Sequence, residues 1–277
     1  MKGKLYLVAT PIGNLEDITL RALRILKEVD LIAAEDTRHT LGLLNHFEIS
    51  KPLISYYKQN EKTKSEILIQ KLLEGKNVAV VSDAGTPGIS DPGEEIVKVA
   101  IENGIEIIPV PGACAFVNAL IASGLSSKEF AFVGFLSAAK KEKRDKLEEI
   151  KYETRTMIFY EAPHKLKGTL EEMLDILGDR NIVLARELTK IHEEFIRDRI
   201  SNILARIENI KGEFVILVEG NSISKKDVEL SNLNDKTLEE HYEFYALQGL
   251  EKKEIIKKIA KDRNTNKNEI YQYFLEK

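Results

Sequence analysis

Short apolar runs alternate with amphipathic stretches over the first 110 residues of the chain. Apolar runs rich in β-branched residues predict strands at 4–9, 31–34, 53–56, 78–82 and 105–109. Between them, apolar residues recur at helical spacing and predict helices at 17–29, 41–47, 64–73 and 94–103. Such alternation is typical of a mostly parallel sheet that is covered on both faces. We therefore expect an α/β domain here.

The pattern changes near residue 112, where PVPGACAFVNALIASGL joins a turn to an apolar helix rich in small residues. Further strands are predicted at 130–134, 156–160, 182–186 and 213–219, with helices at 143–150, 165–177 and 200–207. Residues 222–235 are polar and lack a sustained period, which favours a linker. We expect α/β domains at 1–115 and 116–221, and a helical domain at 236–277 with a polar turn at 263–266.

Composition limits the classes of function. The chain has 277 residues and 41 basic against 45 acidic side chains, so net charge does not attract it to nucleic acid, and any RNA contact must be local. A single cysteine, Cys114, excludes a disulfide framework, and His164 and His192 lack partners at metal-ligand spacing, so no bound metal is expected. The absence of an apolar run of about 20 residues and of a secretory signal predicts a cytoplasmic protein without membrane contact.

Turn-rich segments follow three strands of the first predicted sheet: TPIGN, AEDTRHT and SDAGTPGISDPG. Each alone is ordinary turn chemistry, but together they lie where ligands bind in open α/β sheets, at the carboxyl ends of strands. The third segment, residues 82–93, has more glycine and proline than a plain connection needs, so we expect a binding loop. It matches neither the Walker loop nor the dinucleotide fingerprint, which disfavours ATP and NAD.

These segments, with VPGACA, FYEAPHKL and LARELTK, carry a family resemblance over about residues 4–220. They are similar to the signature segments of the ribosomal RNA small subunit methyltransferase I family, a branch of the tetrapyrrole-methylase superfamily. The resemblance implies two α/β domains with S-adenosylmethionine in the cleft between them, and a homodimer. It also implies 2′-O-methylation of a cytidine in the decoding region of 16S ribosomal RNA within the small ribosomal subunit. TPIGN and Thr86 depart from the Gly-rich turn and the aspartate of the wider superfamily, as in its RNA-modifying branch.

The resemblance also implies which residues form the site. The expected contacts to S-adenosylmethionine are made largely by backbone atoms, at Pro11, Gly85, Thr86, Pro87, Ile89, Ser90, Cys114, Ala115, Tyr160, Glu161, Ala162, Ala185, Glu213 and Phe214. The expected contacts to RNA phosphates and bases are at Asn14, Arg38, His39, Arg186 and Lys190.

Methylation of a ribose hydroxyl depends mainly on positioning, and a general base adds about 10²–10⁴-fold where one exists. The candidate catalytic residues are Asp36 and Glu161, with His39 as a further option, and Asp36 is favoured. Asp36 has an alternative role, because an aspartate at this position often caps the following helix or pairs with a neighbour such as Arg38. The chemistry also remains compatible with no dedicated base.

Two other functions remain open. One is methylation of a different substrate on the same fold, of the tetrapyrrole or diphthamide type. The other is a non-catalytic ribosome-binding or DNA-binding protein, because apolar residues on both sides of the turn at 263–266 suggest a helix-turn-helix. Basic and acidic residues nearly balance in 236–277, so the net charge of this region attracts nucleic acid only slightly. The resemblance implies that it helps to grip the ribosomal substrate.

Overall fold

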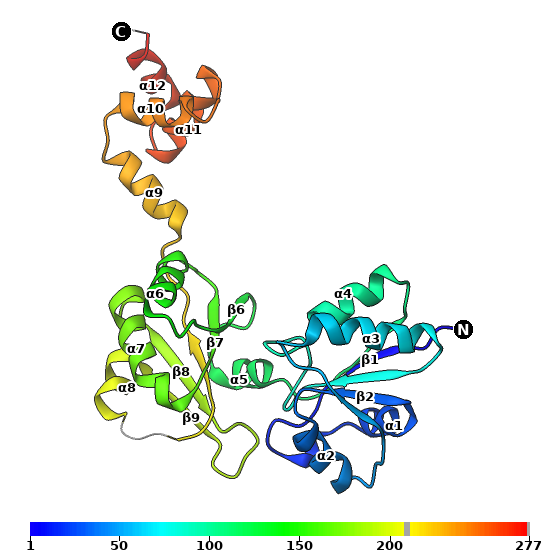
Figure 1. Ribbon diagram of the computed structural model, residues 1–277. Helices are drawn as coiled ribbons and strands as arrows, with labels where there is room; N and C mark the ends of the chain where they lie inside the picture. Colours follow the sequence, from blue (N-terminus) through cyan, green and yellow to red (C-terminus); the bar gives the residue numbers. More distant parts are fainter. Residues whose placement is uncertain (208–210, 276–277) are drawn as a thin grey trace. The chain divides into compact units, whose positions relative to one another are not determined.

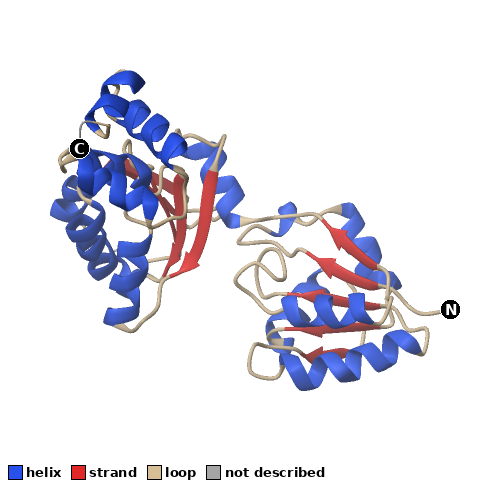
Figure 2. Ribbon diagram, turned by 90° about the horizontal axis from the view of Figure 1, so that it is seen from above, coloured by secondary structure: helices blue, strands red, loops and turns tan. Residues whose placement is uncertain are grey.

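The computed structural model describes residues 1–207 and 211–275, and its first half is a five-stranded parallel sheet. The strands are ordered β3-β2-β4-β1-β5 and span Leu5–Val8 (β1), Leu31–Ala34 (β2), Leu53–Ser55 (β3), Val78–Val81 (β4) and Ile107–Val110 (β5). The helices are α1 (Leu20–Glu28), α2 (Thr37–His46), α3 (Glu61–Leu73) and α4 (Glu94–Glu102), preceded by a 3-10 turn at Leu15–Asp17. Helices lie on both sides of this sheet (Figure 2), as the pattern predicted.

Alternate side chains of the strands face two separate cores, which explains why the strands are continuously apolar. On one face, Leu31 and Val80 pack with α3 and α4 through Leu68 and Ile96. On the other face, Ile32, Ala79 and Val81 pack with α1 and α2 through residues such as Leu26 and Leu44. Both faces of the sheet are therefore buried, and the loops that follow its strands begin at its carboxyl edge.

A second five-stranded sheet follows, and it is mixed. Its order is β6-β7-β10-β8-β9, with β6 (Phe130–Phe135), β7 (Thr156–Glu161), β8 (Asn181–Arg186), β9 (Glu194–Arg199) and β10 (Phe214–Val218). Only β6 and β7 pair in parallel; the other pairs are antiparallel. Helix α5 (Ala115–Ser123) packs on one face, while α6 (Lys140–Glu149), α7 (Pro163–Leu177) and α8 (Ile200–Arg206) gather on the other side (Figure 1). The expected α/β class is confirmed.

Strand β9 was not expected from the sequence. It is an edge strand with the sequence EFIRDR, in which exposed and half-buried residues are mixed. Charged side chains are common on edge strands because they discourage pairing with another chain. The hydrophobic pattern therefore carries little signal for this strand.

The chain divides into two compact units, one of residues 1–148 and 156–219 that holds both sheets, and one of residues 149–155 and 220–277. The second unit contains α9 (Lys225–Asn234), α10 (Leu238–Ala246), α11 (Lys252–Asp262) and α12 (Lys267–Tyr273). Helix α9 occupies the segment expected to be a linker, and a capping box between Ser224 and Asp227 starts it. In the described residues, no helix is long and apolar enough to cross a membrane.

The core of the second unit is small and apolar. Ile255, Ile256 and Ile259 of α11 are buried against Tyr245 of α10 and Ile270 of α12. Beside this core, Arg263 donates hydrogen bonds to the carbonyls of Leu233, Lys236 and Thr237 and to Nδ1 of the buried His241. These bonds hold the turn after α11 to the ends of the neighbouring helices. The three helical segments predicted in 236–277 are present.

Candidate active site

The loops after β1, β4 and β5 are tied to one another at the carboxyl edge of the first sheet. The N–H of Thr10 donates to the Gly85 carbonyl at 2.9 Å, and the N–H of Gly85 donates back to the Thr10 carbonyl at 3.0 Å. The hydroxyl of Thr86 donates to the Ala113 carbonyl at 3.1 Å. Gly85 has a φ of 86°, a conformation that favours glycine. The three loops therefore form one framework.

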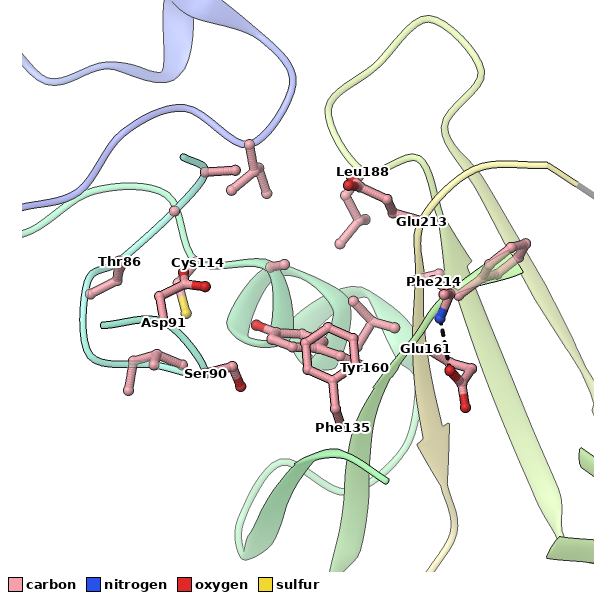
Figure 3. Close-up of a pocket in the computed structure, with 18 of the residues that line it drawn as sticks. Thr86, Ser90, Asp91, Cys114, Phe135, Tyr160, Glu161, Leu188, Glu213 and Phe214 are labelled. Carbon is pink, nitrogen blue, oxygen red and sulfur yellow. Dashed lines mark hydrogen bonds between the residues drawn. The ribbon is translucent and has the colours of Figure 1, made fainter. Parts of the chain in front are cut away.

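A cavity of about 480 Å³ opens beside this framework. One wall comes from the loops after β4 and β5, and the other from the second sheet, which contributes the ends of β7, β8 and β10 (Figure 3). Most of the residues predicted to bind S-adenosylmethionine line it: Gly85, Thr86, Ile89, Ser90, Cys114, Ala115, Tyr160, Glu161, Ala162, Ala185, Glu213 and Phe214.

Two of the predicted cofactor residues lie elsewhere. Pro11 lines a second cavity, and Pro87 sits inside a turn closed by the Ile89 N–H and the Thr86 carbonyl, outside the linings of both cavities. Other lining residues were missed by the sequence analysis: Ile12, Ala84, Asp91, Phe135, Pro163, His164, Leu188 and Val215. Asp91 belongs to the quoted SDAGTPGISDPG segment, so the loop was found but not this side chain.

Two aromatic side chains, Phe135 and Tyr160, line the first cavity, and further rings pack against Tyr160. The rings of Phe132 and Phe135 lie against Tyr160 with centroids 5.1 and 5.4 Å apart, and Phe116 stacks on Phe132 at 4.6 Å. The Tyr160 hydroxyl accepts a hydrogen bond from the Phe116 N–H at 3.3 Å. Burial raises the pKa of Tyr160, so this group stays neutral. This part of the lining is therefore aromatic, and a hydrogen bond holds its one hydroxyl, that of Tyr160.

Glu161 lies in the lining but its carboxylate is already bonded. It accepts a hydrogen bond from the Ala162 N–H at 2.9 Å and another from the Thr169 hydroxyl at 2.6 Å (Figure 3 draws the first as a dashed line). The residue is only 7% exposed. These contacts anchor the start of α7 to the end of β7, which favours a positioning role.

Asp91 has a different environment. It lies on the cavity wall next to Cys114 (Figure 3), and its carboxyl is near the carboxylates of Glu35 and Asp83. Burial, and then repulsion from Glu35 and Asp83, raises the pKa of Asp91 to about 7. This carboxyl therefore exchanges a proton near neutral pH.

Asp36, the favoured candidate base, has the alternative role that the sequence left open. Its carboxylate caps α2 by accepting from the Arg38 N–H at 2.8 Å, and it pairs with the Arg38 guanidinium at 2.9 Å. The contacts with Arg38 lower the pKa of Asp36 to about 2. Asp36 is absent from the linings of both cavities, and a carboxylate with so low a pKa is a weak base.

A second cavity, of about 580 Å³, lies beside the first and shares Ile12, Ala84 and Glu213 with it. Its lining is more polar and includes Arg38, His39, Asp83 and Lys190, together with the loop from Thr10 to Gly13. The Arg38 side chain is 90% exposed. Three of the residues predicted to contact RNA, namely Arg38, His39 and Lys190, thus line one cavity.

Lys190 lines the second cavity and pairs with Glu213, which lines both cavities. Its ammonium group lies 3.0 Å from carboxylate oxygens of both Glu187 and Glu213. A Cβ atom on Gly13 would come within 2.5 Å of the Lys190 side chain, so only glycine allows this close approach between the two walls.

The other two predicted RNA contacts have local structural roles. Arg186 donates to the Lys211 carbonyl at 2.7 Å and pairs with Glu194, and it lines neither cavity. Asn14 caps the 3-10 turn by accepting from the Glu16 N–H at 3.1 Å. Their proposed contact with RNA therefore has less structural support than that of Arg38, His39 and Lys190.

Comparisons with known proteins agree over almost the whole chain. Residues 4–204 match the family model described as Tetrapyrrole (Corrin/Porphyrin) Methylases. The chain is 52% identical to the ribosomal RNA small subunit methyltransferase I of Halalkalibacterium halodurans, over 99% of this chain and 95% of that protein. It is 51% identical to the protein of the same name from Bacillus subtilis, over 98% of this chain and 94% of that protein.

Solved structures share the fold. The crystal structure of uroporphyrin-III C-methyltransferase from Thermus thermophilus, complexed with S-adenyl homocysteine, superposes with a TM-score of 0.56 at 20% identity. The match covers 78% of this chain and 97% of that one.

Proposed function

Because the chain belongs to the tetrapyrrole methylase family, and within it to the ribosomal RNA small subunit methyltransferase I proteins, we propose that it methylates small-subunit ribosomal RNA with S-adenosylmethionine as methyl donor. The observation that carries the proposal is the 52% identity, over nearly the full length, with a protein of that name. Two adjoining cavities, of which the second has the more polar lining, support it.

The first cavity fits the methyl donor. Its volume of about 480 Å³ is within the range of small-ligand sites, roughly 300–1,000 Å³, and it combines apolar walls with backbone groups of the loops at Gly85 and Cys114. Bound S-adenosylmethionine supplies a methyl group activated by a positively charged sulfur. Aromatic faces and carboxylates attract such a cation, and Tyr160, Phe135 and Asp91 provide both.

The second cavity fits the nucleotide that is methylated. Arg38 and Lys190 are cations that can contact phosphate, and His39 adds a ring on which a base can stack. Since the two cavities share Ile12, Ala84 and Glu213, a group held in one lies next to a group held in the other. The tied loops and the buried first sheet below them keep the wall on that side in place, which favours reaction by positioning.

The finer substrate assignment rests on the family resemblance. We propose that the acceptor is the 2′-hydroxyl of a cytidine in the decoding region of 16S ribosomal RNA, presented by the small subunit. A protein that acts on ribosomes is expected in the cytoplasm. The sequence of the second compact unit resembles the accessory domain of the family, and the proposed role of that unit is to help hold the ribosomal substrate.

The proposed homodimer has a candidate surface on α5 and β6. Val117 and Ile121 of α5 are 42% and 72% exposed, and Phe130 of β6 is 40% exposed, with its ring 6.1 Å from that of Phe116. Contiguous exposed apolar side chains are common at interaction sites. A second copy of the chain is the proposed occupant.

The proposal is tested by incubating the protein with labelled S-adenosylmethionine and one of three acceptors: unmethylated small subunits, naked 16S RNA or a tetrapyrrole. Incorporation into the subunits or the RNA is the expected result. Incorporation into the tetrapyrrole alone, or into none of the three despite binding of S-adenosylhomocysteine, contradicts the proposed substrate.

A further inference from the structure

We propose that Glu187, at the start of the turn between β8 and β9, is a positioning residue for the acceptor RNA, because it holds the Lys190 ammonium at the second cavity. Glu187 itself lines neither of the two cavities. The inference rests on the proposed function and deepens it, since it names a residue that shapes the acceptor site without touching the acceptor.

The Glu187 carboxylate connects two segments of the second sheet. Its Oε1 accepts one hydrogen bond from the Lys190 ammonium at 3.0 Å and one from the Glu213 N–H at 3.0 Å. The Glu187 N–H donates to the Glu213 carbonyl at 3.0 Å, and the Lys190 N–H donates to the Glu187 carbonyl at 3.0 Å. Glu187 thus fixes both Lys190, which lines the second cavity, and Glu213, which lines both cavities.

The turn that carries Glu187 and Lys190 has an unusual backbone. Glu187 has a φ of 50° and Thr189 a φ of 67°, which are unfavourable conformations for residues with side chains. Such strain persists only where surrounding contacts hold it, and it is frequent at binding sites. A Cβ on Gly212 would come within 2.6 Å of the Glu187 side chain, and a Cβ on Gly13 within 2.5 Å of the Lys190 side chain. The turn therefore packs closely against both neighbouring segments.

Glu187, rather than Glu213, determines where the Lys190 ammonium lies. The Glu187 side chain is 19% exposed, whereas the Glu213 side chain, whose carboxylate is also 3.0 Å from this ammonium, is 80% exposed. An exposed ion pair contributes little, because solvent screens the charges and the side chains stay free to move. The Glu187 carboxylate is also held by the Glu213 N–H, so it is the fixed partner of the ammonium.

The Lys190 ammonium keeps its charge and a donor for the acceptor. Burial lowers the pKa of Lys190, but the hydrogen bonds to Glu187 and Glu213 outweigh this effect and raise the pKa above its usual value. An ammonium has three N–H donors, and within the described residues Glu187 and Glu213 take two of them. The third can reach a phosphate oxygen. A cation that is already held in place loses less conformational entropy when RNA binds.

The test compares wild-type protein with Glu187→Gln in methyl transfer to unmethylated small ribosomal subunits. Glutamine keeps an oxygen that accepts the Glu213 N–H but has no charge to hold the ammonium. We expect the KM for the subunits to rise about three- to tenfold, with kcat changed by less than about twofold. Net charge alone predicts the opposite, since removing a carboxylate near a phosphate site favours RNA binding. The direction of the change therefore separates positioning from general electrostatics.

Glu106→Gln is the matched control. Glu106 pairs with Lys4 at 2.8 Å, and these residues directly precede β5 and β1, at the amino end of the first sheet. The variant removes the same charge from a lysine–glutamate pair at the end of the sheet opposite to the loops of the site, so KM and kcat should stay near wild type. A rise in KM equal to that of Glu187→Gln would contradict a specific role for Glu187.

A double-mutant cycle shows whether Glu187 acts through Lys190. In a protein that already carries Lys190→Ala, Glu187→Gln has no cation left to position, so we expect no further rise in KM. Independent effects, in which the two rises in KM multiply, contradict the proposal. The Kd of Glu187→Gln for S-adenosylhomocysteine, measured by calorimetry, should change by less than about threefold, because the contact with the Glu213 N–H is kept.

An unchanged or lower KM of Glu187→Gln contradicts the proposal, as does a rise in KM matched by an equal loss of S-adenosylhomocysteine affinity, which would indicate a general structural role. All of these comparisons use an active wild-type protein. Absence of methyl transfer to the subunits by the wild type contradicts the proposed function itself, so the two failures are distinguishable.

Discussion

The two cavities share three lining residues but differ in what holds their shape. The first has aromatic rings and turn backbone around it, and its carboxylates are fixed by local contacts or by burial. The second has long charged side chains, Arg38 and Lys190, whose ammonium and guanidinium groups pair with nearby carboxylates. A shaped apolar cavity suits one small donor, whereas cationic side chains suit a large anionic acceptor. Because the two cavities differ in this way, we expect some mutations to weaken binding of the donor alone and others to weaken binding of the acceptor alone.

Gly85→Ala should have the largest effect on the first cavity. At a φ of 86° a side chain is strained, and the new Cβ would lie 3.2 Å from Cγ2 of Ile12, which lines both cavities. We expect the Kd for S-adenosylhomocysteine to rise by about tenfold or more, corresponding to roughly 1.4 kcal/mol or more. Calorimetric titration measures it.

Gly178→Ala is the matched control for Gly85→Ala. Gly178 ends α7 with a φ of 84°, and a Cβ there would meet nothing within 4 Å. Both variants should lose stability, by about 1–3 kcal/mol, because each places a side chain on a residue with positive φ. Equal loss of S-adenosylhomocysteine affinity in both would refute a specific role for the loop at Gly85.

Lys190→Ala and Arg38→Ala should weaken binding of the acceptor RNA at the second cavity and not binding of the donor at the first. Each is expected to reduce affinity for 16S RNA by about tenfold and to lower the salt dependence by about one phosphate contact. The Kd for S-adenosylhomocysteine should stay unchanged for Arg38→Ala, because Arg38 does not line the first cavity. Filter binding across a range of salt concentrations measures both quantities.

Arg24→Ala is the control for these two variants. Arg24 is an exposed arginine of α1 that pairs with Glu28 at 2.7 Å, much as Arg38 pairs with Asp36. Its loss should leave RNA affinity and the salt slope close to wild type. If Arg24→Ala reduced the salt dependence of RNA binding by the same amount, Arg38 and Lys190 would contribute only general surface charge and no specific phosphate contacts.

The pH dependence of stability sharpens the contrast between Asp91 and the paired carboxylates. The folded-state pKa of Asp91, about 7, lies above its usual value of 3.8, so the folded protein binds more protons between these values and loses stability as pH rises through them. Asp91→Asn removes this cost. We expect its Tm to exceed that of wild type by roughly a few °C at about pH 8, and by less at about pH 5.

Differential scanning calorimetry of the protein without ligands provides this measurement. A lower Tm for Asp91→Asn at both pH values would show that Asp91 stabilises the fold, and would argue against its raised pKa.

Asp36→Asn should have the smallest effect. Asparagine also caps helices, and the variant loses mainly an ion pair with the exposed Arg38. We expect turnover to change by less than about threefold, which is far below the effect of losing a general base. A loss of about 10²-fold at saturating donor and acceptor would restore Asp36 as the base.

Sequence patterns predicted the first sheet well because its strands are buried on both faces and are apolar throughout. They missed β9, an exposed edge strand, and α9, whose start is fixed by the capping box at Ser224 rather than by an apolar stripe. Tertiary pairing and a local cap decide these elements, and neither leaves a periodic signal.

The site was only partly predictable for a related reason. Glycine and proline in residues 82–93 marked the loop, and the family resemblance supplied the wall from the second sheet. The chemistry of Asp91 depends on Glu35, which is distant in sequence and comes close only when β2 and β4 pair. Likewise, the sequence left open whether Asp36 pairs with Arg38, and the folded structure shows the ion pair that makes Asp36 a weaker base.

The most direct test of the account identifies the methylated atom. Small subunits labelled by the wild-type protein are digested to nucleosides, which are separated and analysed by mass spectrometry. The account predicts label in 2′-O-methylcytidine. Label in a base-methylated nucleoside, or in the 2′-O-methyl derivative of another nucleoside only, would contradict it.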